Sequence, residues 1–279
     1  MDELHVSCAA VGEYVKHSAA TLHSVFEHAG MPVRVHYLHG PAFPQADAGL
    51  LAAMVERLGG QIDFHEIADA RVSGLPVVSR FTAAMWYRIF LPELVPTADR
   101  VLYLDSDTIA VDSLEPLWRT DLAGQWLGAV TNVFQENHIW RPAELGLSGP
   151  EVYFNSGVLL MNLDQMRRDE RTEALVACAT ERGDALEWPD QDALNLVLGE
   201  RRARLHPRWN CMNSVLAFPG AVKAHGRWRI RQARRRPGIR HFEGPSTNKP
   251  WHRDCDPASQ ELYARHRRAT PWPEFELEG

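Results

Sequence analysis

The sequence is poor in cysteine and lysine, and it contains no apolar run of the ~20 residues that a membrane-spanning helix needs. Its four cysteines include no Cys-x-x-Cys pair, which argues against a zinc knuckle or a redox couple and suits a reducing compartment. The formal net charge of -6 gives no indication of nucleic-acid binding. The first residues do not resemble a signal peptide, so we expect a cytoplasmic protein.

What the sequence does contain is an alternation of strand-like and helix-like segments. This alternation predicts an α/β fold with a mainly parallel sheet and right-handed crossovers. The 279 residues allow one large domain. Strands are expected at 4–10, 33–38, 61–66, 101–104, 126–131 and 154–162, and from 239. Helices are expected at 13–28, 46–58, 81–91 with Pro92 as the stop, 163–182, and after 188.

The most informative stretch is Asp105-Ser106-Asp107 after the apolar residues 101–104. Ligands of open α/β sheets bind at the carboxyl ends of strands. If the backbone stays extended through Ser106, both carboxylates point the same way and repel unless a cation lies between them. Mg²⁺ or Mn²⁺ holding the phosphates of a nucleotide is the natural candidate. The alternative is an ordinary turn or helix cap, for which Asp and Ser are also typical.

No glycine-rich phosphate loop follows the first strand, so a bound diphosphate would need a metal and basic side chains. Arg88 is either a solvated surface charge or a guanidinium that reaches the phosphates or the carboxylates. His241, at the end of a strand-like run and followed by Lys249, suits a third metal ligand beside a phosphate clamp. We expect Asp192 to cap a helix, whereas Asp190 is open to either role.

Two further groups of residues favour structural interpretations. The seven arginines between residues 227 and 240 are expected to form a solvated surface rather than a face for anionic lipid or acceptor. Several tryptophans could stack on an acceptor sugar, but burial in the core is expected for each: Trp86, Trp140, Trp188 and Trp209.

Four separated motifs together carry a resemblance to a known family. They are residues 102–107, residues 154–157 with their apolar tail, Asp190-Gln191-Asp192, and residues 241–244 leading to Lys249-Pro250-Trp251. The chain resembles glycosyltransferase family eight, especially the bacterial lipopolysaccharide galactosyltransferases and glucosyltransferases. The resemblance implies a single GT-A domain over residues 1–279, with about 220–279 completing the metal and diphosphate site. It also implies a Mn²⁺ ion (Mg²⁺ being possible), a UDP-hexose donor, a saccharide or glycolipid acceptor and retention of anomeric configuration.

The resemblance also implies roles for individual residues. Asp105, Asp107 and His241 look like the metal ligands. Gln191, Asp190 and Asn155 look like the catalytic residues around the donor sugar, with Gln191 as a weak nucleophile or front-face stabiliser and Asp190 holding a sugar hydroxyl. Contacts with the nucleotide sugar are implied for Ala9, Ala10, Tyr14, Arg88, Leu104, Ser106, Gly244 and Lys249.

The sequence departs from the family pattern at three places. Val11-Gly12 replace acidic residues that contact the uracil, although Tyr14 remains where an aromatic residue stacks on the base. The spacing from Gly244 to Lys249 is two residues longer than usual. Asn132 replaces an aspartate near the acceptor. At most peripheral membrane contact is expected.

Two competing hypotheses remain. An apolar strand followed by Asp-x-Asp-Thr also describes the nucleophile motif of haloacid-dehalogenase phosphatases. Such an enzyme needs a downstream lysine with a further acidic pair, and the lysines here are Lys16, Lys223 and Lys249. The other alternative is a sugar-nucleotide-binding protein without activity, which the altered turn at Val11-Gly12 keeps open.

Overall fold

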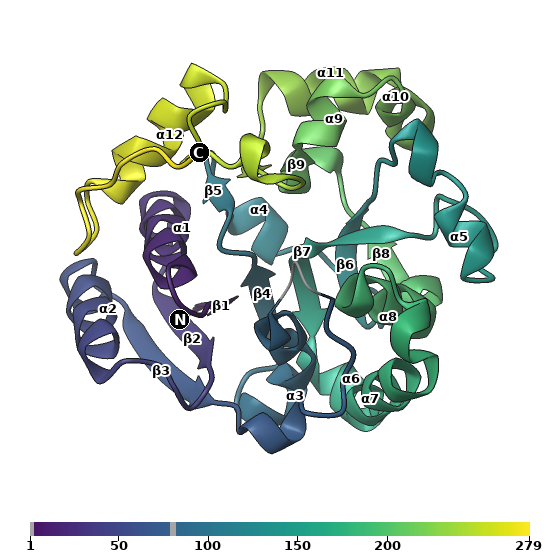
Figure 1. Cartoon of the computed structure of the whole chain (residues 1–279), viewed down its shortest axis with the longest axis horizontal. Coiled ribbons are helices and arrows are strands. Elements are labelled where there is room, and N and C mark those ends of the chain that lie inside the picture. Colours follow the sequence, from purple (N-terminus) through teal and green to yellow (C-terminus); the bar gives the residue numbers. More distant parts are fainter. Residues whose placement is uncertain (1–2, 79–81) are drawn as a thin grey trace.

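The computed structural model describes residues 3–78 and 82–279, and its centre is a seven-stranded sheet in the order β3-β2-β1-β4-β7-β6-β8 (Figure 1). Strands β3, β2, β1 and β4 run parallel, and β6 and β8 are parallel to each other. β7 is antiparallel to both of its neighbours, β4 and β6. The strands are β1 (Leu4–Ala9), β2 (Val33–His39), β3 (Gln61–Glu66), β4 (Arg100–Leu104), β6 (Leu127–Thr131), β7 (Phe154–Asn162) and β8 (Arg202–Arg204). The expected α/β fold with a mainly parallel, mixed sheet is confirmed.

The reversed direction of β7 matters for function. Because β7 pairs Val158 with Leu104 in an antiparallel register, the start of β7 lies beside the carboxyl end of β4. That end is where α/β sheets bind ligands. Residues 154–157, which precede this pairing, are therefore brought next to Asp105.

Helices cover both faces of the sheet, and the strand side chains alternate between the two layers. On β4, Leu102 and Leu104 join one hydrophobic core, whereas Val101 and Tyr103 join the other. The first core is closed by α1 (Tyr14–His28), α2 (Gln45–Arg57), α4 (Glu115–Trp118), α9 (Asn213–Ala217), α10 (Gly220–His225) and α11 (Arg227–Arg235). The second is closed by a 3-10 helix (Ala83–Phe90), α3 (Leu91–Leu94), α6 (Leu163–Arg168), α7 (Arg171–Arg182) and α8 (Pro189–Leu198).

A second, three-stranded sheet extends the carboxyl end of β4. Its order is β5-β10-β9, with β10 antiparallel to β5 and parallel to β9. The strands are β5 (Thr108–Ala110), β9 (Cys211–Met212) and β10 (Ile239–His241). The C-terminal helix α12 (Pro257–Arg267) lies alongside α1, so the first and the last helix of the chain are neighbours (Figure 1).

The structure corrects three of the expected elements. The helix expected at 163–182 is two helices, because Glu170 adopts a left-handed conformation (φ 53°) between them. The segment expected as a helix over 81–91 is the 3-10 helix, with Phe81 outside the described residues. Pro92 does not stop a helix but stands in the first turn of α3, where its missing N–H has no helical partner to lose.

The basic stretch follows the expectation except at its end. The arginines of α11 are exposed, but Arg240 in β10 is buried and donates to the carbonyl of Cys211. Among the residues that the structure describes, we find no helix with the length and apolarity required to cross a bilayer.

Candidate active site

The Asp105-Ser106-Asp107 segment forms a turn after β4 and does not continue as a strand. The amide of Thr108 donates to the carbonyl of Asp105 (3.2 Å), and the Ser106 hydroxyl donates to the carbonyl of Ala9 at the end of β1 (3.1 Å). The condition of an extended backbone through Ser106 is therefore not met, because the amide and the hydroxyl group of Thr108 both bond back to the carbonyl of Asp105 within the turn. The turn still directs both carboxylates toward one place.

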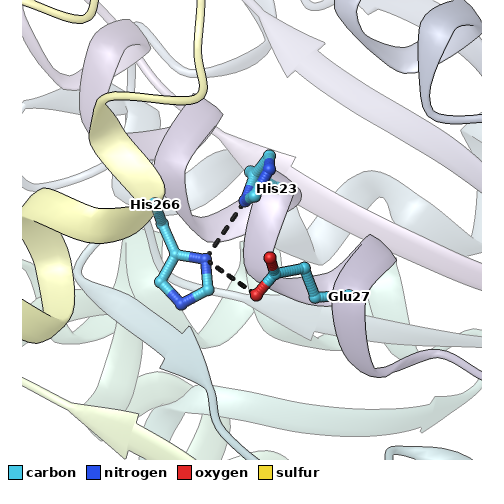
Figure 2. Close-up of side chains that lie close together, drawn as sticks. All are labelled: His23, Glu27 and His266. Atoms are coloured by element: carbon cyan, nitrogen blue, oxygen red, sulfur yellow. Dashed lines mark hydrogen bonds and ion pairs between the residues drawn. The ribbon is translucent and has the colours of Figure 1, made fainter.

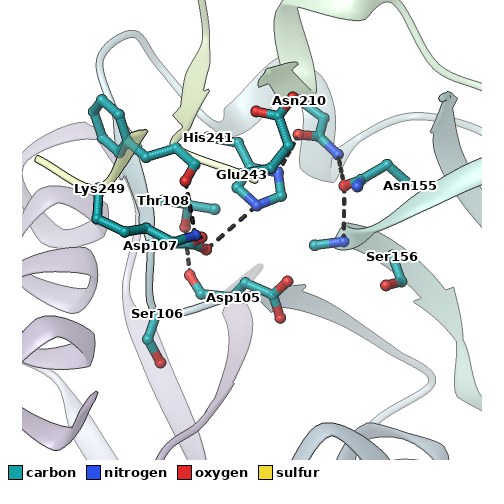
Figure 3. A network of polar contacts seen from close by, with 12 residues as sticks. Asp105, Ser106, Asp107, Thr108, Asn155, Ser156, Asn210, His241, Glu243 and Lys249 are labelled. Carbon is teal, nitrogen blue, oxygen red and sulfur yellow. Dashed lines mark hydrogen bonds and ion pairs between the residues drawn. The ribbon is translucent and has the colours of Figure 1, made fainter. Parts of the chain in front are cut away.

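His241 joins these carboxylates because β10 pairs with β5. In that register His241 lies opposite Thr108, and the amide of Phe242 donates to the carbonyl of Asp107 (3.0 Å). Asp105, Asp107 and His241 each offer a ligand atom within 4.8 Å of the others (Figure 3). Two carboxylates and one imidazole fit Mn²⁺ or Mg²⁺, so the donor chemistry agrees with the expected metal.

A relay of amide groups fixes the orientation of the His241 ring (Figure 3). The amide N–H of Gly157 donates to Oδ1 of Asn155 (3.0 Å), which also accepts from Nδ2 of Asn210 (2.7 Å). Oδ1 of Asn210 therefore faces Nδ1 of His241 (2.9 Å), and an oxygen can only accept. Nδ1 must carry the proton, which leaves Nε2 of His241 for a metal.

Gly157 leaves the space that this arrangement needs. A Cβ atom at Gly157 would lie 2.3 Å from Cε1 of His241 and 2.8 Å from Oδ2 of Asp105. Any other residue would thus push against two of the candidate ligands. This explains why the stretch 154–157 contains a glycine at its fourth position.

Lys249 supplies a cation beside the candidate metal ligands. Its Nζ contacts Oδ2 of Asp107 (2.5 Å) and donates to the carbonyl of Phe242 (2.8 Å). Burial by itself would raise the pKa of Asp107, but Lys249 and His241 outweigh it and hold that pKa well below its usual range. Burial would lower the pKa values of Lys249 and His241, yet the Asp107 carboxylate raises both. The longer spacing before Lys249 therefore still brings its ammonium group to the site.

Arg88 is buried and links Asp105, one of the candidate metal ligands, to Asp190 at the start of α8. Its guanidinium lies 2.9 Å from Oδ1 of Asp105 and 3.4 Å from Oδ2 of Asp190, and it donates to the carbonyl of Ser156 (2.7 Å). Of the two roles considered, the surface role is excluded. Burial raises the pKa of Asp190 to about 6, even though Arg88 opposes this shift.

The amide group of Gln191 is oriented by the start of β7. Its Oε1 accepts from the amide of Ser156 (3.0 Å) and from Nδ2 of Asn155 (3.1 Å), while its Nε2 donates to the Tyr153 hydroxyl (3.2 Å). Asp192 is fully buried and accepts from Tyr153 and from the backbone amides of residues 187 and 188. Asp192 thus has a structural role, but it is not the expected helix cap, since it lies inside α8 and the start of that helix has no side-chain cap.

The residues expected to contact the nucleotide lie around the ends of β1 and β4. The Tyr14 ring is 46% exposed at the start of α1 and meets Trp251 edge-on at 5.8 Å. Gly244 has a φ of +100°, and a Cβ there would lie 2.7 Å from Nδ2 of Asn248. Ala10 and the side chain of Leu104 are buried, so a ligand would meet them through the backbone.

Sequence reasoning missed the roles of several residues in this network. Asn210 connects Asn155 to His241, and the Tyr103 hydroxyl donates to Asp105 (3.1 Å). Asn210 stands in no motif, and Tyr103 lies in the motif 102–107 only as one of its apolar residues, so only the three-dimensional arrangement reveals these two contacts. The prediction that four tryptophans are buried is correct for Trp86 and Trp209. It is wrong for Trp188, which is half-buried, and for Trp140, which is exposed.

Comparisons with known proteins cover nearly the whole chain. A model of glycosyl transferase family 8 matches residues 5–255. General stress protein A of Bacillus subtilis is 26% identical over 278 residues, which are 96% of this chain and 94% of that protein. Lipopolysaccharide 1,2-glucosyltransferase of Escherichia coli is 26% identical over 73% of this chain and 66% of its own length. A crystal structure of the galactosyltransferase LgtC with donor and acceptor sugar analogues is 28% identical, with a TM-score of 0.83 and coverage of 96% of both chains.

Proposed function

This chain belongs to glycosyl transferase family 8, and on that premise we propose that it moves a hexose, galactose or glucose, from a UDP-sugar to a hydroxyl group of a saccharide or glycolipid. The proposal includes retention of anomeric configuration and a dependence on Mn²⁺. One observation carries it: Asp105, Asp107 and His241 converge beside Lys249, and the donor-side residues Asn155 and Gln191 are bonded to the same network. Family membership also removes the phosphatase alternative.

The first half of the site would bind the diphosphate of the donor. Asp105, Asp107 and Nε2 of His241 would hold the metal ion, which stabilises the negative charge that develops on the leaving diphosphate. Lys249 adds a second cation at the same place, beside Asp107. Arg88 keeps Asp105 in position through its short contact and is itself held by the carbonyl of Ser156.

The second half of the site would hold the hexose. Asp190 lies next to Arg88, and we propose that its carboxylate accepts a hydrogen bond from a hydroxyl group of the donor sugar. Gln191 is neutral and cannot attack as a carboxylate would. Its Oε1 is fixed by Ser156 and Asn155. We propose that this amide group lies beside the face of the sugar from which the diphosphate leaves. The acceptor hydroxyl would attack on that same face and pass its proton to the diphosphate.

The nucleotide would lie along the ends of β1 and β4. We propose that Tyr14 stacks on the base, that Ala9, Ala10, Leu104 and Ser106 line its path through backbone and hydroxyl groups, and that Gly244 lets the backbone approach the diphosphate. The exposed ring of Tyr14 supports this role, because an aromatic face is available next to the turn that follows β1.

The acceptor is proposed to be a saccharide, free or lipid-linked, as in the lipopolysaccharide enzymes to which the chain is similar. Aromatic rings stand next to Gln191: Phe134 lies 5.0 Å from the ring of Tyr153 and 6.3 Å from that of Trp188. Such rings suit the apolar faces of sugars. All four cysteines are unpaired, which supports a cytoplasmic location for the enzyme.

Slow donor hydrolysis is the experiment that tests this proposal. The protein is incubated with a panel of nucleotide sugars, with and without Mn²⁺, and free nucleoside diphosphate is measured. Mn²⁺-dependent release of UDP from one UDP-hexose is expected, and release should be lost in Asp107→Asn but kept in a surface control such as Lys223→Gln. Binding of UDP-sugars without any turnover, with acceptors supplied, would instead establish a non-catalytic binding protein.

A further inference from the structure

A second cluster of metal-binding side chains lies outside the site described above, between the first and the last helix. His23 and Glu27 stand one turn apart on α1, and His266 reaches them from α12 (Figure 2). Nδ1 of His23 is 3.1 Å from Nδ1 of His266, which is 3.7 Å from Oε2 of Glu27. All three ligand atoms lie within 4.8 Å of one another.

These separations are close to those of a tetrahedral metal site. With metal–ligand distances of about 2.0–2.1 Å, two ligand atoms of a tetrahedral zinc ion lie about 3.3 Å apart. The observed values of 3.1 and 3.7 Å lie on either side of that separation. We propose that His23, Glu27 and His266 bind a zinc-type divalent cation, with the fourth position left to water.

The two histidine rings present the same nitrogen, Nδ1, to one point, and burial favours the neutral form that binds a metal. Their side chains are buried, and burial lowers both pKa values, that of His266 to about 4. Two neutral rings whose Nδ1 atoms face each other share one proton between them. Binding a cation moves that proton to the Nε2 of the same ring, so no charge has to be neutralised first.

The third ligand gives access from solvent. Glu27 is exposed, so an ion can reach the cluster from solvent. Arg265 donates to Oε2 of Glu27 (2.8 Å) and so orients the carboxylate, as hydrogen-bond partners commonly orient metal ligands. The positive charge of Arg265 opposes every divalent cation alike, so the metal preference follows from the ligand atoms. Zn²⁺, Co²⁺ and Ni²⁺ favour imidazole, so this site differs in metal preference from the carboxylate site at Asp105.

A cation here would fasten the C-terminal helix to the N-terminal one. α12 already contacts α1 through Tyr263, whose hydroxyl is 2.6 Å from Nδ1 of His17. The His17 ring in turn stacks on Trp251 at 3.6 Å, two residues after Lys249. The cation would thus strengthen the helix pair that supports the Lys249 segment, without touching the reaction itself.

Cobalt titration tests this inference, and its result does not depend on the proposed function. Tetrahedral Co²⁺ has visible absorption bands that octahedral Co²⁺ at an oxygen-rich site does not show with comparable strength. We expect one equivalent of tetrahedral Co²⁺, and Zn²⁺ should displace it and raise the Tm by roughly 5 °C at saturating concentration.

Variants decide which residues bind the ion. Glu27→Ala, at an exposed position that the fold tolerates, and His266→Gln should each weaken Co²⁺ binding at least ~10-fold. His28→Gln, a histidine next to the cluster, is the matched control and should bind as the wild type does. Asp107→Asn should also leave the bands intact. The inference is overturned if no tetrahedral bands form, if they persist in Glu27→Ala, or if they disappear in Asp107→Asn.

Discussion

Replacing Gly157 by alanine tests the geometry of the candidate metal site without removing any ligand. The added Cβ would lie 2.3 Å from Cε1 of His241, whereas ordinary contacts begin at 3.4 Å, a deficit of about 1.1 Å. The ring has little freedom to move away, because Asn210 holds Nδ1 and β10 is paired on both sides. The same Cβ would also press on Asp105 at 2.8 Å.

The expected cost of Gly157→Ala has two parts. Overpacking of this kind destabilises a protein by roughly 1–3 kcal/mol. Metal–ligand distances tolerate only about 0.2 Å, so two displaced ligands should lower the Mn²⁺ affinity by roughly 10- to 100-fold. The affinity is measured by electron paramagnetic resonance of free Mn²⁺, and stability is measured by urea unfolding. Mn²⁺-dependent UDP release should fall in parallel.

The matched control is Gly199→Ala. Gly199 has a helical backbone (φ -58°), and a Cβ there would meet its nearest atom, the carbonyl oxygen of Val152, at 3.5 Å. We expect it to be neutral or stabilising by up to ~1 kcal/mol, with normal Mn²⁺ affinity. If Gly157→Ala binds Mn²⁺ as tightly as the wild type and the control, then His241 and Asp105 are not the ligands.

Three further substitutions have distinct expected outcomes. Asp107→Asn should abolish Mn²⁺-dependent UDP release and leave Lys249 without its buried carboxylate, at a cost of roughly 3 kcal/mol at pH 7. Because the pKa of Asp107 is lowered, the wild type has the higher free energy of unfolding above about pH 4, and this difference decreases as the pH falls further. Urea unfolding that shows the same difference between wild type and Asp107→Asn at pH 7 and pH 3 would contradict this reasoning. Asp190→Asn should reduce sugar transfer yet stabilise the fold at pH 8. The reason is that the pKa of Asp190 is raised to about 6 in the folded wild type. The contribution of Asp190 to the free energy of unfolding is therefore highest below about pH 4 and decreases by up to ~3 kcal/mol as the pH rises through 6. A Tm of Asp190→Asn below that of the wild type at pH 8 would refute this. Arg88→Lys should lower activity and stability together, since one ammonium cannot reach Asp105, Asp190 and the carbonyl of residue 156 at once; unchanged UDP release would exclude a positioning role.

Local patterns in the sequence were sufficient to predict the centre of this fold. The apolar run 101–104 ends in two carboxylates, and β4 does end there with Asp105 at its carboxyl end. The predicted strand at 154–162 has the same bounds as β7. Both are buried strands that contain an apolar run of four residues, 101–104 and 158–161, so a signal that extends over a few neighbouring residues is enough to identify them.

Three features of the structure could not be predicted from local sequence patterns. The approach of His241 to Asp107 depends on the register of β10 against β5, and no periodicity within either three-residue strand encodes that register. The break at Glu170 depends on a left-handed backbone at a residue type that usually avoids it. The direction of β7, antiparallel within a mostly parallel sheet, is also a property of the whole sheet.

The start of β7 shows what three consecutive residues contribute to the site. Asn155 contributes a side-chain amide that is fixed by the N–H of Gly157, and through Asn210 this sets which nitrogen of His241 carries a proton. The backbone N–H of Ser156 sets the orientation of the Gln191 amide. Gly157 contributes the empty space in which two candidate ligands approach. Backbone groups of one strand therefore orient both halves of the site, and because a strand is more rigid than a loop, the two halves keep a fixed relation to each other.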